Sequence, residues 1–194
     1  MARWRTGWTT DLHTGTIPLM ATPQTSLGTV YGIGHSNHPI TEFYRLLTLH
    51  NIREVLDVRS HPNLTRWPQY QKDAIRDYLR SAGMSYYHVP RLGGRPMSTQ
   101  AELDAYLPNW LPFREPTALM CAEGKYLECH RHYNLTPALR RAGLRVLQIR
   151  PDGSVVEDTG PTPEKLISVA EHLPPQDRPP DWWKTPEKAQ LALL

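Results

Sequence analysis

The stretch that decides the fold is TVYGIGHSNHPITEFYRLLTLHNIREVLDV, residues 29–58. Its first five residues form a short apolar run that predicts a buried strand. Phe43, Leu46 and Leu47 then follow at the i, i+3, i+4 spacing of one helix face. A second apolar run, Val55–Val58, ends the stretch and predicts another strand. Strand, helix and strand in this order predict two parallel strands joined by a crossover helix.

The same alternation continues along the chain. Three further apolar runs predict strands, at Tyr86–Val89, Thr117–Ala122 and Leu144–Ile149. Helical faces separate them: Ile75, Tyr78, Leu79 and Ala82 form one, and Leu103, Tyr106, Leu107 and Trp110 form another. A last helix is predicted over 163–172. The pattern predicts an α/β domain with a mostly parallel sheet of about five strands and helices on both faces.

The domain boundaries follow from where this rhythm begins and ends. We assign residues 28–173 to the α/β domain, 1–27 to an irregular N-terminal extension and 174–194 to a C-terminal tail rich in Pro and Trp. Thr41 is predicted to cap the first helix, and a Thr-Pro-Glu sequence at Thr185 predicts a short helix in the tail.

Composition limits the class of protein. The chain has 194 residues, a formal net charge of +3 and a pI near 8.9, which permit an anionic partner. It lacks a long apolar run and a secretory pattern, so we expect a cytoplasmic protein without membrane contact. Cys121 and Cys129 are expected to be reduced thiols, with Cys121 a small core residue. They have no second Cys or His pair at zinc-finger spacing, and His130-Arg131-His132 is too sparse, so we predict no metal site and no cofactor.

Polar residues gather where the predicted strands end, and in a parallel sheet these ends share one edge. We predict a single cleft there. Its candidate substrate-binding residues are Gly34, His35, Ser36, Asn37, Arg59, Ser60, Trp67, Tyr70, Gly93, Gly94 and Arg131, and its candidate catalytic residues are Asp57, Glu123, Cys129 and His130.

The catalytic candidates each allow two interpretations. Asp57 and Glu123 offer a carboxylate that acts as a base or faces a developing cation. Alternatively, Asp57 is structural and pairs with Arg59. Cys129 stands beside His130 and Arg131, which would favour its thiolate. Arginine forks suit phosphate or carboxylate groups, and exposed aromatic rings would stack on a base.

Five blocks of sequence together resemble one known family. They are Tyr31–Asn37, Leu56–Ser60, Leu92–Gly94, Cys121–Glu123 and Cys129–Arg131. These blocks are similar to the signatures of the family called domain of unknown function 488. The resemblance spans roughly residues 29–150 and implies an α/β fold with a site built from these blocks, while the family name implies no settled activity. Pro137 departs from the pattern, since it lies where a helix interior is expected, so the helix either begins near Thr136 or kinks there.

Missing motifs narrow the expected chemistry. The sequence has no Walker loop, no dinucleotide-binding glycine motif and no metalloprotease motif. We therefore expect a metal-independent hydrolase acting on DNA or another phosphate-bearing substrate, and most specifically a DNA glycosylase. Two alternatives remain open: a hydrolase or Cys-dependent transferase of small phosphorylated or nucleoside-like metabolites, and a non-catalytic module that binds anions or nucleic acid.

Overall fold

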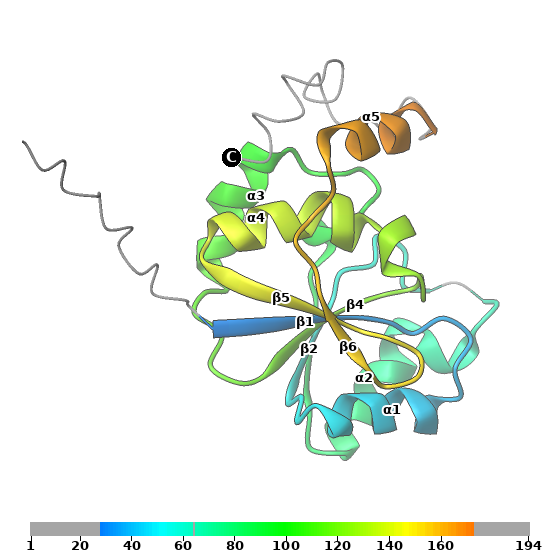
Figure 1. The fold of residues 1–194 in the computed structure, drawn as a ribbon. Helices are drawn as coiled ribbons and strands as arrows, with labels where there is room; N and C mark the ends of the chain where they lie inside the picture. Colours follow the sequence, from blue (N-terminus) through cyan, green and yellow to red (C-terminus); the bar gives the residue numbers. More distant parts are fainter. Residues whose placement is uncertain (1–27, 64, 173–194) are drawn as a thin grey trace, which may run out of the picture.

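The computed structural model describes residues 28–63 and 65–172 (Figure 1). The predicted extension at 1–27 and the predicted tail at 174–194, with its helix at Thr185, lie outside the described residues. The strands are β1 (Gly28–Gly34), β2 (Glu54–Asp57), β3 (Ser85–His88), β4 (Thr117–Cys121), β5 (Leu144–Ile149) and β6 (Val155–Glu157). The α-helices are α1 (Ile40–Leu49), α2 (Lys72–Ser81), α3 (Gln100–Tyr106), α4 (Thr136–Arg141) and α5 (Pro163–His172).

The strands form one sheet in the order β3-β2-β4-β1-β5-β6. Every neighbouring pair is parallel except β5 and β6, which are antiparallel. This confirms the predicted α/β class with a mostly parallel sheet. The sixth strand was not predicted, because its three residues are too few to show an alternating pattern. Because β1 lies between β4 and β5, the loops that follow β1 and β4 meet at the centre of the carboxyl edge.

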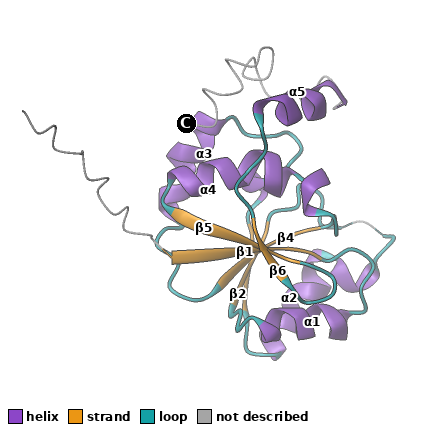
Figure 2. Cartoon of the chain, viewed as in Figure 1, coloured by secondary structure: helices purple, strands orange, loops and turns teal. Residues whose placement is uncertain are grey.

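Helices cover both faces of the sheet, as predicted (Figure 2). Helices α1 and α2 pack on one face, where Phe43, Leu47, Ile75 and Leu79 are fully buried. Helices α3 and α4 pack on the other face around a second buried cluster that includes Leu103. None of the described helices is long and apolar enough to cross a membrane.

The N-cap of α1 lies two residues before the predicted position. The helix begins at Ile40, and Pro39 occupies the cap position in place of Thr41. The carbonyl oxygen of Pro39 accepts hydrogen bonds from the backbone amides of Glu42 and Phe43. The fixed φ of proline suits this junction, so the helix starts without a side-chain cap.

The backbone around Pro137 follows the first of the two predicted alternatives. A π-helical turn occupies Arg131–Leu135, and α4 then begins at Thr136 with Pro137 in its first turn. Proline is tolerated there because the first helical amides have no partner within the helix. The Thr136 hydroxyl lies 2.9 Å from both the Arg131 carbonyl oxygen and an Asp158 carboxylate oxygen, shares its one proton between these two acceptors and so closes the junction. Cys129 and His130 therefore precede a π-helical turn.

Candidate functional site

A pocket of about 550 Å³ opens at the carboxyl edge of the sheet. The loop after β2 contributes one wall, the loops after β3 and β4 contribute two more, and the π-helical turn and α5 complete the rim. Its lining residues are Arg59, Ser60, His61, Gly94, Arg95, Cys121, Ala122, Glu123, Leu127, Glu128, Cys129, His130, Tyr133, Lys165 and Ser168.

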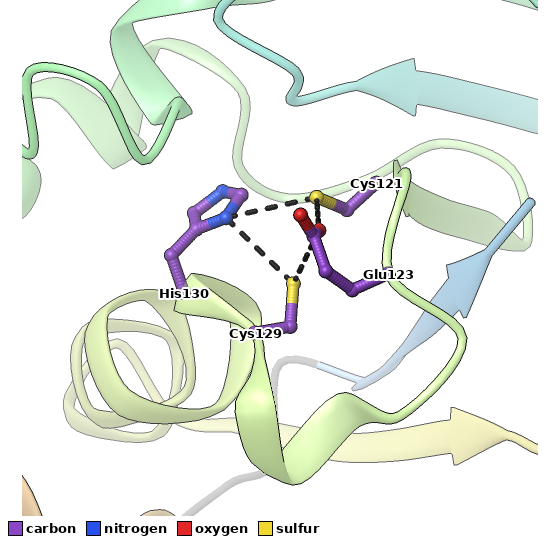
Figure 3. Close-up of side chains that lie close together, drawn as sticks. All are labelled: Cys121, Glu123, Cys129 and His130. Atoms are coloured by element: carbon purple, nitrogen blue, oxygen red, sulfur yellow. Dashed lines mark hydrogen bonds between the residues drawn. The ribbon is translucent and has the colours of Figure 1, made fainter. Parts of the chain in front are cut away.

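Four side chains converge in this pocket: Cys121, Glu123, Cys129 and His130 (Figure 3). A Glu123 carboxylate oxygen accepts from the Cys121 thiol at 2.6 Å and from the Cys129 thiol at 3.4 Å. The Nδ1 atom of His130 lies 3.7 Å from each sulfur. The potential ligand atoms of all four residues lie within 4.8 Å of one another.

The loop after β4 brings these residues together because it is fastened to β1. The backbone amides of His35 and Ser36 donate to the carbonyl oxygens of Cys121 and Ala122, both at 2.9 Å. Gly34 faces the returning chain so closely that a Cβ atom there would lie 1.9 Å from the Glu123 carbonyl oxygen. The chain then turns through a 3₁₀ segment at Tyr126–Glu128 and delivers Cys129 opposite Cys121.

The ring of His130 is held in one orientation. Its Nε2 atom lies 3.1 Å from the Leu92 carbonyl oxygen, an acceptor, so Nε2 carries the proton. In the neutral ring Nδ1 then carries the lone pair, and it faces both sulfurs. Gly94 lies against the ring, where a Cβ atom would be 2.9 Å from Cγ of His130. The loop after β3 thus fixes both the position and the tautomer of the imidazole.

A buried guanidinium lies behind the cluster. Arg131 is 2% exposed and donates to the Cys129 sulfur at 3.2 Å and to the Glu123 carbonyl oxygen at 2.7 Å. Burial by itself would raise the pKa of Cys129, but a hydrogen bond from Cys121 and the charge of Arg131 hold it well below its ordinary value. The hydrogen bond with Cys129 and burial raise the pKa of Cys121 well above its ordinary value. The two thiols therefore ionise unequally, with Cys129 losing its proton before Cys121.

Asp57 does not line the pocket. It is fully buried and accepts from Arg59 through both oxygens and from the Tyr86 hydroxyl at 2.6 Å. His35 lies on the other side of Arg59 and stacks on Tyr70 with ring centroids 4.1 Å apart. The structural alternative, an Asp57–Arg59 pair, is confirmed, and this pair supports the loop after β2.

The remaining predicted residues divide by position. Six predicted site residues line the pocket: Arg59, Ser60, Gly94, Glu123, Cys129 and His130. Nine others do not: Asp57, Gly34, His35, Ser36, Asn37, Trp67, Tyr70, Gly93 and Arg131. Tyr70 is only 1% exposed, and Trp67 packs against the core under α1 and α2, so neither ring offers a stacking face to the pocket.

Sequence reasoning missed several lining residues. Cys121 is buried, as expected of a core residue, yet its sulfur also faces the pocket. Tyr133 lies within the π-helical turn, and Lys165 comes from α5, far along the chain. The i, i+3 apolar spacing marks such residues as helix, but nothing in it shows which helix reaches the pocket.

The cluster also bears on the expectation of no metal site. That expectation rested on the local spacing of Cys and His. The structure brings the two cysteines together through the loop after β4, so the spacing argument does not apply to these residues. Two sulfurs, an imidazole nitrogen and a carboxylate are ligands that zinc takes in proteins.

Comparison with known proteins supports the resemblance in part of the chain. Residues 39–110 match the family model described as "Domain of unknown function DUF488". No curated protein and no solved structure matches the chain. The matched segment ends before Cys121, so the argument for the Cys121, Glu123, Cys129 and His130 cluster rests on its geometry alone.

Proposed function

We propose that this chain is a hydrolase of a phosphate-bearing, nucleobase-containing substrate, with cleavage of an N-glycosidic bond in DNA as its first candidate reaction. The observation that carries the proposal is the placement of Glu123. Its side chain is exposed, lines the pocket and lies beside a buried imidazole and two thiols. A carboxylate in that position suits activation of water or stabilisation of a sugar cation.

The charges around the pocket support an anionic substrate. Arg95 and Lys165 line it from two different elements, the loop after β3 and helix α5. Arginine and lysine bind phosphate groups, the arginine as a planar fork and the lysine as a compact charge. Tyr133 and Leu127 add an aromatic and an aliphatic wall, of the kind that holds an extruded base.

The roles in the reaction follow from these positions. The C1′–N bond breaks, the base leaves with the bonding electron pair, and the Glu123 carboxylate faces the sugar cation that develops. Water then adds to C1′ and gives its proton to Glu123. The departing base takes a proton from solvent, and Glu123 later returns its own to solvent. Asp57 takes no part, since Arg59 and Tyr86 occupy its oxygens.

The test is an assay for abasic sites. Labelled single- and double-stranded DNA with normal and modified bases is incubated with the full chain, treated with alkali and separated on a denaturing gel. We expect strand breaks that require alkali, and a loss of roughly 100-fold or more in rate for Glu123→Gln.

Glu128→Gln is the matched control, because Glu128 lines the same pocket but pairs with Lys125 at 3.4 Å on the surface. Equal losses in both variants, or no breaks with any substrate of the panel, would overturn the proposal. Turnover of free nucleotides without any action on DNA would support the metabolite hydrolase instead.

A further inference from the structure

We propose that Cys121, Cys129 and His130 bind a zinc ion, with Glu123 at the fourth position on the pocket side. The proposal concerns binding, and its test needs no turnover; in the hydrolase reaction proposed above, Glu123, the exposed ligand of the four, leaves the ion to face the sugar. It rests on the distances between donor atoms, on the tautomer of His130 and on the balance of charge.

The distances match those of a tetrahedral zinc site. Zn–S bonds of about 2.3 Å and Zn–N bonds of about 2.0 Å place a sulfur and a nitrogen ligand about 3.6 Å apart. The His130 Nδ1 atom lies 3.7 Å from each of the two sulfurs. The Glu123 oxygen lies 3.4 Å from the Cys129 sulfur, where a tetrahedral site needs about 3.5 Å.

One distance departs from this geometry. The Glu123 oxygen lies 2.6 Å from the Cys121 sulfur, which is closer than two ligands of one zinc ion. Glu123 is exposed, so a modest rotation of its side chain restores the spacing without moving the backbone. The two distances from the His130 Nδ1 atom to the sulfurs need no such movement, and the imidazole and the two sulfurs are the three ligands that define the site.

The contact made by the other ring nitrogen of His130 is typical of a metal-binding histidine. Such a ring usually donates its other N–H to a carbonyl or carboxylate, which leaves the ligating nitrogen with a free lone pair. His130 makes that contact, with its Nε2 atom 3.1 Å from the Leu92 carbonyl oxygen. Its Nδ1 lone pair is therefore directed at the space between the sulfurs (Figure 3).

Charge also favours a divalent cation. Two thiolates and the Glu123 carboxylate carry three negative charges in a largely buried cluster. Arg131, 2% exposed and 3.2 Å from the Cys129 sulfur, supplies one positive charge. Zn²⁺ supplies the other two, and the two thiol protons leave to solvent as it binds. The cluster is then neutral overall, which lowers the cost of burying it.

The experiment uses the tag-free full chain, reduced with a phosphine and stripped with a chelator. Zinc is titrated in competition with a chromophoric chelator, and cobalt(II) is then used as a spectroscopic probe. We expect one zinc per chain and a thiolate-to-cobalt charge-transfer band. Cys121 and Cys129 are the only cysteines in the chain, so that band can arise only from this cluster.

Ligand variants complete the test. Cys121→Ser and Cys129→Ser are expected to weaken zinc binding by more than about 100-fold, a larger loss than follows when a residue that only hydrogen-bonds to a ligand is changed. His50→Gln is the control, because His50 bonds to the Gly153 carbonyl oxygen away from the pocket and should bind zinc normally. Less than about a tenth of an equivalent of zinc, or a cobalt spectrum without thiolate bands in the wild-type chain, would overturn the site. Both readouts are independent of turnover, so a failed glycosylase assay leaves this result unaffected.

Discussion

Arg59 folds back over Asp57 and binds both of its carboxylate oxygens, through Nε at 2.8 Å and Nη2 at 2.6 Å. Asp57 is fully buried and Arg59 is 7% exposed. Arg59 also donates to the Tyr70 carbonyl oxygen at 2.8 Å, so the pair ties β2 to the segment that precedes α2. A carboxylate with all these partners positions a loop and has no oxygen left for a substrate.

Asp57→Asn should therefore lower the free energy of unfolding. The substitution leaves the guanidinium buried without its counter-charge, and breaking such a pair costs about 3–5 kcal/mol. Urea unfolding measures this loss. Tyr86→Phe removes one hydrogen bond to the same carboxylate and should cost less, about 1.5–3 kcal/mol. An Asp57→Asn protein of normal stability but without activity would return Asp57 to the catalytic group.

Asp158 performs a similar task beside the π-helical turn. Its carboxylate accepts from the side chains of His132, Thr136 and Gln148, at 2.8, 2.9 and 2.8 Å, and from the Gly160 amide at 2.9 Å. These contacts join β5 to the π-helical turn that follows His130.

Asp158→Asn should destabilise the fold and loosen that turn. The NH₂ group of the asparagine would face groups that now donate hydrogen bonds to the carboxylate. We expect a loss of about 3 kcal/mol in the free energy of unfolding. Thr136→Val removes a single donor and should cost about 1 kcal/mol. Similar losses in the two variants would show that the carboxylate is not the centre of this network. Urea unfolding of both proteins makes the comparison.

Local pattern was enough to predict most of the fold. Buried strands such as β4 and β5 are continuous apolar runs, and α1 and α2 carry clear helical faces, so burial and periodicity marked them in the sequence. Strand β6 has three residues with only Val156 partly buried, and its pairing with β5 is a tertiary contact. Length, more than composition, kept it out of the prediction.

The site was predictable only where neighbours in sequence decide it. Glu123, Cys129 and His130 follow strand or loop ends, which is why they were chosen. Asp57 was ambiguous because Tyr86, its second partner after Arg59, comes from the neighbouring strand β3. Cys121 looked like core because its strand is buried throughout, and no local pattern shows that a loop returns Cys129 to it.

Gly34 should tolerate no side chain. The Cβ atom of an alanine would lie 1.9 Å from the Glu123 carbonyl oxygen, and both groups belong to backbone that hydrogen bonds hold in place. We expect Gly34→Ala to cost about 1–3 kcal/mol and to displace the loop that carries Glu123.

Gly124→Ala is the matched control for that substitution. Its Cβ atom would lie 3.2 Å from the Ser36 side chain, which can move aside, so the cost should be smaller. Unfolding in urea gives the two free energies, and amide chemical shifts report whether the loop has moved. Equal stability of Gly34→Ala and the wild-type chain would contradict the close approach of β1 to this loop.

His35 should make the fold sensitive to mild acid. Burial, and then the charge of Arg59, lower the pKa of His35 from 6.5 to about 4. In the unfolded chain the imidazole takes up a proton near pH 6.5, whereas the folded chain resists it until about pH 4. Stability should therefore fall as the pH drops from 6.5 towards 4, by at most about 3 kcal/mol from this residue.

The chain has nine histidines, so the informative quantity is the difference between wild type and His35→Gln in urea unfolding at several pH values. The variant should be less stable at pH 7.5, through loss of the stacking on Tyr70, and should lose less of its remaining stability on acidification. Parallel pH profiles for the two proteins would mean that His35 is protonated in the fold as easily as in the unfolded chain.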